Sequence, residues 1–102
     1  MKQLYLVLFF LCIAAGHAQS SRTGTDIDGF DLYPNPVTHG KVYIKTTEDA
    51  PKKVHIFNVF GTPVLQTTLL GSELNLSELD AGVYVIRVFQ RDKVATRKLI
   101  VK

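Results

Sequence analysis

The feature that most constrains this chain is a series of short β-type segments separated by turn residues, running from about residue 30 onward. Within the segments, Val, Ile, Phe and Tyr tend to stand at every second position, and Gly, Pro, Asn and Asp cluster between them. A period of two is typical of strands with one face in the core, and turn signals about every 8–12 residues are typical of a sandwich. Because no segment keeps helical spacing for more than about one turn, the sequence predicts an all-β domain.

The pattern predicts a small immunoglobulin-like two-sheet antiparallel sandwich of about seven strands, which suits so short a domain better than a closed barrel. The first strand should stop at Pro34-Asn35-Pro36, because neither proline can donate to a strand ladder. The expected strands cover residues 30–33, 41–45, 53–59, 63–70, 73–76, 83–90 and 94–101.

Alternation within the strands also predicts which side chains face the core. Val42 and Ile44 should share a buried face, as should Val54 and Ile56, with His55 and Phe57 opposite the latter pair. In strand 83–90 one face should carry Tyr84, Ile86 and Val88, and the other Val83, Val85, Arg87 and Phe89.

Two connections carry recognisable turn signals. Asn58-Val59-Phe60-Gly61 has Asn first and Gly last, as a type I turn prefers, so the strands on either side should form a hairpin. Residues 77–80 fit a single helical turn capped by Ser77 and Asp80, or else a plain polar turn.

The N-terminus has the layout of a secretory signal peptide over residues 1–18. Lys2 precedes an apolar run from 4 to 15, and small residues at 16 and 18 predict cleavage between Ala18 and Gln19. The apolar run is shorter than the roughly 20 residues that span a bilayer, so we expect no permanent membrane anchor, a retained anchor being the alternative. The only cysteine, Cys12, would leave with this leader, so no disulfide or thiol site is expected.

Residues 19–29 contain one apolar side chain and predict a flexible linker or a vestigial passenger ahead of a domain at 30–102. The net charge of +3 is too small to indicate a nucleic-acid partner.

No arrangement of residues indicates catalysis, a metal site or a cofactor, so we expect no enzyme. His39 and His55 lack metal-ligand spacing to any partner, and are interpreted as a turn residue and a half-exposed strand residue. Asp26-x-Asp28-Gly29-x-Asp31 places its glycine at position 4, whereas a calcium-binding EF-hand loop needs one at position 6, so an acidic solvated segment is expected.

Four motifs occur in order along the domain, and individually each is common. They are Tyr33-Pro34-Asn35-Pro36, then Asn58 to Gly61 followed by Val64, then Leu76-x-x-Leu79-x-x-Gly82-Val83-Tyr84, and finally Lys98 to Lys102. Together they resemble the type A C-terminal sorting domain of cargo proteins for the type IX (Por) secretion system of Bacteroidota.

This resemblance implies a transport function. The signal peptide would engage the general export machinery, and the folded domain would be recognised in the periplasm and pass the outer membrane through the type IX translocon. A sortase would then cut near the start of the domain, leaving its cargo on the cell surface, joined to an anionic lipopolysaccharide, or free outside the cell.

The resemblance assigns recognition chiefly to the tail, residues Lys98, Leu99, Ile100, Val101 and Lys102. A terminal strand at a sheet edge offers unpaired backbone groups to which a partner can bind. The alternative is that these residues form an ordinary core strand that closes the sheet, and both can hold at once.

Two other functions stay open. The chain could be the remnant of a truncated gene, because its passenger is so short. It could also be a small exported module that binds a glycan or an envelope protein through an exposed aromatic patch of Tyr43, Phe57, Phe60 and Phe89. Core or hairpin packing of these aromatics is favoured, because a small sandwich needs its large side chains inside.

Overall fold

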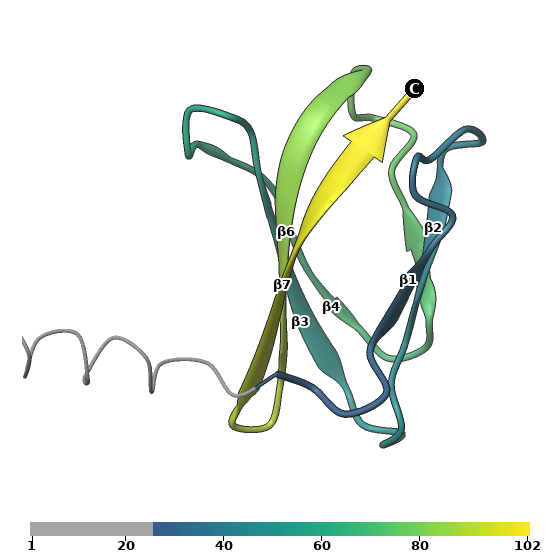
Figure 1. The fold of residues 1–102 in the computed structure, drawn as a ribbon, viewed down its shortest axis with the longest axis vertical. Helices are drawn as coiled ribbons and strands as arrows, with labels where there is room; N and C mark the ends of the chain where they lie inside the picture. Colours follow the sequence, from purple (N-terminus) through teal and green to yellow (C-terminus); the bar gives the residue numbers. More distant parts are fainter. Residues whose placement is uncertain (1–25) are drawn as a thin grey trace, which may run out of the picture.

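The computed structural model describes residues 26–102, and these form two antiparallel β-sheets packed face to face (Figure 1). One sheet has three strands in the order β1-β2-β5, and the other has four in the order β4-β3-β6-β7. The predicted sandwich is thus confirmed. The strands are β1 (Asp31–Tyr33), β2 (Lys41–Lys45), β3 (Lys52–Phe57), β4 (Pro63–Leu69), β5 (Glu73–Asn75), β6 (Gly82–Gln90) and β7 (Lys93–Val101).

The core between the sheets is almost entirely aliphatic. Val42 and Ile44 of β2, like Val54 and Ile56 of β3, are fully buried, as their alternation predicts. The only aromatic residue of the buried cluster among the described residues is Tyr84, which shares the inner face of β6 with buried Ile86 and Val88.

The expectation that the aromatics pack inside is therefore wrong. Tyr43, Phe57 and Phe89 are half-buried on the outer faces of the sheets, and Phe60 is 88% exposed in the β3–β4 turn. The physical reason is strand alternation, since Phe57 and Phe89 directly follow the buried Ile56 and Val88 and must point to the opposite face.

The predicted hairpin turn between β3 and β4 is confirmed. The Gly61 amide donates to the Asn58 carbonyl at 3.0 Å, and the Asn58 side-chain oxygen accepts from the amides of Phe60 and Thr62. Gly61 has φ of +82°, which glycine adopts without the steric cost that a side chain would add.

Residues 77–80 form the plain turn, and the alternative of a capped helical turn is wrong. The Leu79 amide donates to the Leu76 carbonyl at 3.0 Å, and the Ser77 amide donates to the side-chain oxygen of Asn75 at 2.9 Å. Asn75, at the end of β5, therefore supplies the local cap that was expected from Ser77.

The packed part of the chain reaches further toward the N-terminus than the boundary predicted at residue 30. Ile27 is only 5% exposed and belongs to the core cluster, and the Asp28 carbonyl accepts a hydrogen bond from the Thr47 amide. The Ile27 side chain and the hydrogen bond between the Thr47 amide and the Asp28 carbonyl thus hold residues 26–29 against the sandwich. The predicted leader, its cleavage point at Ala18–Gln19, Cys12 and the rest of the linker lie outside the described residues.

Candidate functional site

The strand that carries the predicted recognition tail, β7, lies at an edge of the four-stranded sheet. It pairs with β6 without a register break, from Gly82 opposite Val101 to Gln90 opposite Lys93. Its inner positions near the tail, Leu99 and Val101, are 0% and 7% exposed. The edge position is one of the two alternatives that the sequence left open, and it leaves one side of β7 without a neighbouring strand of the sheet.

The five tail residues do not all have the same surroundings. Leu99 and Val101 belong to the hydrophobic core. Lys98 and Lys102 are exposed, and Ile100 is half-buried on the outer face of the sheet. The interpretation as a core strand therefore applies to Leu99 and Val101. A partner that approaches the folded domain can contact the outward side chains only.

Residues 35–37, which are the last two residues of the Pro-Asn-Pro motif and Val37, bind to the free edge of β7. We call these three residues the clamp. The Asn35 side chain donates from Nδ2 to the Lys98 carbonyl at 2.8 Å and accepts from the Ile100 amide at Oδ1 at 3.0 Å. Next to it, the Val37 amide donates to the Ile100 carbonyl at 2.7 Å, and the Lys102 amide donates to the Val37 carbonyl at 2.9 Å. Asn35 thus imitates one residue of a neighbouring strand, and fully buried Val37 supplies the next as a parallel bridge.

The clamp corrects the expectation that the tail offers unpaired backbone groups. The outward backbone groups from the Lys98 carbonyl to the Lys102 amide are already hydrogen-bonded. Addition of a partner strand at this point would first have to break four hydrogen bonds. The edge is unprotected further upstream, where the described residues give the Thr96 amide no hydrogen-bond acceptor.

The other motif residues make contacts outside the tail. Tyr33 stacks on Tyr43 with ring centroids 5.6 Å apart, and the Lys45 ammonium lies 5.7 Å from the Tyr33 ring centre. The interaction with the neighbouring Tyr33 side chain raises the pKa of Lys45 above its ordinary value. The Tyr84 hydroxyl donates to the Asp80 carbonyl at 2.6 Å, and so ties the start of β6 to the preceding turn, where Leu79 packs against the core.

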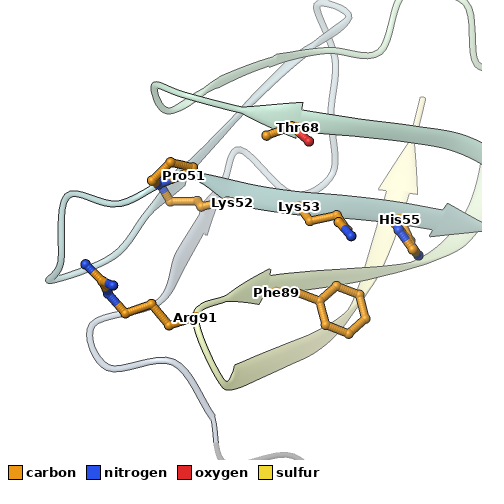
Figure 2. Close-up of a pocket in the computed structure, with 7 residues that line it drawn as sticks. All are labelled: Pro51, Lys52, Lys53, His55, Thr68, Phe89 and Arg91. Atoms are coloured by element: carbon orange, nitrogen blue, oxygen red, sulfur yellow. The ribbon is translucent and has the colours of Figure 1, made fainter.

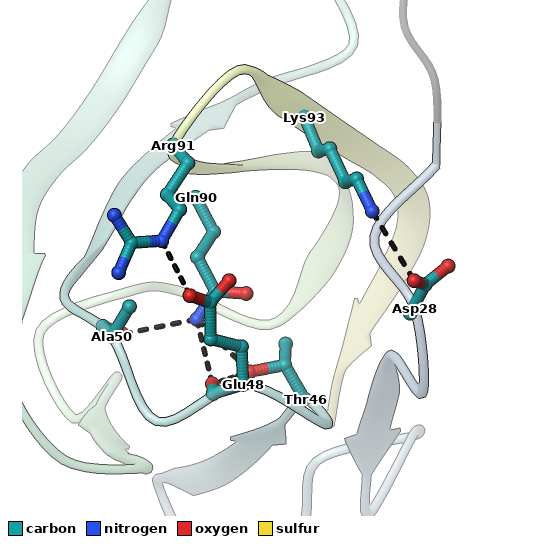
Figure 3. A network of polar contacts seen from close by, with 7 residues as sticks. All are labelled: Asp28, Thr46, Glu48, Ala50, Gln90, Arg91 and Lys93. Carbon is teal, nitrogen blue, oxygen red and sulfur yellow. Dashed lines mark hydrogen bonds and ion pairs between the residues drawn. The ribbon is translucent and has the colours of Figure 1, made fainter.

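Sequence reasoning missed the most connected buried polar residue, Gln90. Its side-chain nitrogen lies 3.0 Å from the Thr46 hydroxyl and 3.0 Å from each of the carbonyls of Glu48 and Ala50 (Figure 3). This amide therefore holds the loop between β2 and β3. The alternation of β6 could have revealed this residue, because Gln90 stands at the next inward position after Tyr84, Ile86 and Val88. A polar side chain buried at such a position needs hydrogen-bond partners inside the domain.

The upstream half of β7 is held by two ion pairs at the surface. Arg97 pairs with Asp26 at 3.0 Å, and Lys93 pairs with Asp28 at 3.2 Å. The hydrogen bond from Arg97 lowers the pKa of Asp26 below its ordinary value. Residues 26–28, which the sequence predicts to be a solvated linker, are therefore bound along this half of the strand.

The single aromatic patch predicted for a binding module is not formed. Tyr43 lies on the outer face of the three-stranded sheet, Phe60 in the hairpin turn, and Phe57 and Phe89 on the outer face of the four-stranded sheet. Phe89 and His55 line an open pocket with Lys53 and Thr68 (Figure 2).

Within residues 26–102 no group of three or more His, Cys, Asp or Glu side chains is placed to hold a metal ion. In the same residues no helix is long and apolar enough to span a membrane.

The family model of the secretion system C-terminal sorting domain matches residues 31–102. The chain belongs to this family. The match begins at β1 and includes the clamp, both sheets and the whole tail. The sorting domain is thus a signal for the type IX secretion system, which exports its cargo to the cell surface or outside the cell, and the family is not catalytic.

A solved structure of PorZ is similar, with a TM-score of 0.57 and 23% sequence identity, over 72% of this chain and 11% of that one. PorZ is described as an essential bacterial surface component of the type-IX secretion system of human oral-microbiomic Porphyromonas gingivalis. At this identity the similarity shows the fold alone, and the chain spans only a small part of PorZ. A comparison with curated protein sequences found no match.

Proposed function

We propose that the type IX machinery recognises the sorting domain in its folded state and binds the outward side chains of the tail. Lys98, Ile100 and Lys102 would contact the partner, and Leu99 and Val101 would act from the core by fixing the position of the tail. The observation that supports this division is the clamp. It occupies the backbone edge beside these residues and leaves their outward side chains accessible.

The route that we propose begins with the leader at residues 1–18. The general export machinery would carry the chain across the inner membrane, with cleavage between Ala18 and Gln19, and the domain would fold in the periplasm before the translocon recognises it. The layout of a short charged region, an apolar run and small residues before the cleavage point supports this route.

We place the sortase cut ahead of Asp26. Residues 26–29 are bound to the sandwich through Ile27, the Asp28 carbonyl and two ion pairs. A protease needs its substrate extended and accessible, so this segment would have to detach before it could be cut. Mass spectrometry of the released product would show a new terminus ahead of Asp26, and a terminus within 26–29 would contradict this placement.

The recognition proposal is tested with a fluorescent protein inserted ahead of Asp26, behind the native leader, in a bacterium with an intact type IX system. Deletion of residues 99–102 would be an ambiguous variant, because it removes Leu99 and Val101 from the core. The tail variant is therefore Lys98→Ala/Ile100→Thr/Lys102→Ala, which changes side chains that lie outside the buried cluster. Its matched control changes three outer positions of the other sheet, Lys41→Ala/Tyr43→Thr/Lys45→Ala.

We expect the parent fusion and the control to reach the surface or the medium, and the tail variant to stay in the periplasm with an unchanged melting temperature. A translocon mutant should retain all three. Export of the tail variant at the parental level would contradict recognition through the outward tail. Export of every fusion in the translocon mutant would contradict the type IX route itself.

A further inference from the structure

The two sheets of the domain differ in the charge on their outer faces. The outward positions of the three-stranded sheet include Asp31 and Glu73 beside Lys41 and Lys45, and Lys41 pairs with Glu73 at 3.2 Å. The corresponding positions of β3, β6 and β7, with Thr68 and Gln66 of β4, include Lys53, Arg87 and Lys98 and no carboxylate. The larger face is therefore basic, and the smaller one is balanced.

The three cations of the larger face take no part in the ion pairs that the described part of the chain forms. None of the four ion pairs formed within residues 26–102 involves Lys53, Arg87 or Lys98. The Arg87 guanidinium lies 5.3 Å from the ring centre of Phe89, an arrangement that keeps its charge above the sheet. The other sheet differs because carboxylates stand beside its outward cations: Lys41 pairs with Glu73, and Lys45 has Asp31 as its register partner.

Apolar side chains lie between and beside these cations. Val83 is 44% exposed and Val85 is 38% exposed, and half-buried Ile100 is the register partner of Val83 on β7. Val85 has Lys98 as its register partner. The face thus has partly exposed aliphatic side chains at its tail end, with Lys98 and Arg87 next to them and Lys53 at the far end. Apolar groups together with charged groups are the usual composition of a protein interface.

We propose that this outer face, made by β3, β6 and β7, docks on an acidic protein surface of the type IX recognition machinery. The proposal rests on the proposed function and deepens it, because Lys98 and Ile100 of the tail belong to the same face. A second copy of this chain is a poor occupant, since it would oppose cations with cations. An anionic polysaccharide would use the cations and leave the valines and Ile100 without an apolar partner.

The size of the face suits a transient contact. Three strands about 4.8 Å apart, the longest with nine residues at a rise of about 3.3 Å each, give a face of roughly 10 by 30 Å. This lies at the low end for specific interfaces, where encounters that must later dissociate are found. A sorting signal has to be released after transport, so a small, electrostatically steered interface agrees with its task.

The test uses the full chain with the reporter ahead of Asp26 and three double variants. Lys53→Glu/Arg87→Glu reverses two cations of the basic face, away from the tail. Lys41→Glu/Lys45→Glu applies the same change of charge to the outer face of the other sheet. Val83→Thr/Val85→Thr removes apolar character from the basic face and keeps side-chain shape and strand preference. Melting temperatures of the purified variants verify that each one folds.

We expect export to fall roughly tenfold or more in Lys53→Glu/Arg87→Glu, to fall severalfold in Val83→Thr/Val85→Thr, and to stay near the parental level in Lys41→Glu/Lys45→Glu. Equal export of the two charge variants, whether normal or reduced, would overturn the proposal. Loss with Lys53→Glu/Arg87→Glu and no change with Val83→Thr/Val85→Thr would also overturn it, and would indicate an anionic glycan.

The tail variant Lys98→Ala/Ile100→Thr/Lys102→Ala separates this proposal from the function on which it rests. If the tail variant is retained and the charge variants are exported equally, the docking face is wrong and recognition through the tail stands. If the tail variant is exported normally, the proposed recognition function fails, whatever the charge variants do.

Discussion

The two halves of strand β7 differ in how much they place in the core and in how their outer edge is held. The tail half has Leu99 and Val101 in the core and its outer backbone edge hydrogen-bonded to the clamp. The upstream half has only the small Ala95 in the core, and its links to residues 26–28 are the ion pairs of Arg97 with Asp26 and Lys93 with Asp28, whose side chains are 38–80% exposed. Core contacts and edge hydrogen bonds fix the position of a strand, and exposed ion pairs contribute little. The family's Pro-Asn-Pro motif thus acts on the half that carries the sorting tail.

The largest effect should come from the core of the tail half. Leu99→Ala removes a fully buried side chain and leaves a cavity, which costs about 2–5 kcal/mol of unfolding free energy. Urea unfolding would measure this loss, with the outward variant Lys98→Ala as the control that should unfold at nearly the parental midpoint. A loss below about 0.5 kcal/mol for Leu99→Ala would show that the tail is not packed in the core.

The next effect tests the clamp itself. Asn35→Ala removes the donor to the Lys98 carbonyl and the acceptor for the Ile100 amide, and should cost about 1–2 kcal/mol, because water replaces part of what is lost at this exposed position. Asn35→Asp keeps an acceptor for Ile100 and sets a second oxygen against the Lys98 carbonyl, so we expect it to be no better than Asn35→Ala. Stability of Asn35→Asp equal to that of the parent would contradict the role of the Nδ2 donor.

The upstream half should respond less. Arg97→Gln removes the ion pair with Asp26 and the contact of the guanidinium with the Phe30 ring, whose centre is 4.8 Å away. We expect a loss of about 0.2–1 kcal/mol, most of which should disappear at high salt because the pair is exposed. Thermal unfolding of both proteins at low and high ionic strength measures it. A loss as large as that of Asn35→Ala would remove the distinction between the two halves.

The smallest effect is a pH dependence at the same place. The hydrogen bond from Arg97 lowers the pKa of Asp26 in the folded state. The resulting stabilisation is present above the ordinary carboxyl pKa and is lost as the pH falls through the lowered folded value. An NMR titration of the Asp26 carboxyl should therefore move toward its ordinary midpoint in Arg97→Gln. Identical midpoints in parent and variant would show that the pair does not form in solution.

The strands could be predicted from the sequence because their signal is local. Alternation around Val54, Ile56 and Ile86 identified buried faces, and the spacing of Asn58 and Gly61 identified a hairpin turn, all within a few residues of chain. The same alternation placed Phe57 and Phe89 outside, against the general expectation that a small core needs aromatics. The alternation of side chains along β3 and β6 thus determined where these aromatics lie, and the need of a small core for large side chains did not.

The clamp and the docking of residues 26–29 could not be predicted in this way. Asn35 and Ile100 are 65 residues apart, and nothing near Asn35 indicates which backbone its amide will meet. From the sequence, an open edge was the expected consequence if the last strand lay at a sheet edge. The strand does lie at an edge, but residues 35–37, from near the start of the domain sequence, cover its tail half. Likewise, the composition of residues 19–29 predicts a linker, and a single isoleucine binds part of it.

Backbone amide hydrogen exchange of β7 distinguishes a clamped tail edge from an open one, because both halves of one strand are measured in one experiment. We expect the Ile100 and Lys102 amides, which point outward into the clamp, to exchange slowly, and the outward Thr96 amide to exchange fast. In Asn35→Ala the Ile100 amide should become fast, and the Thr96 amide should not change. Exchange of Ile100 as fast as that of Thr96 in the parent protein would show that the clamp does not form and that the tail edge is open to a partner strand.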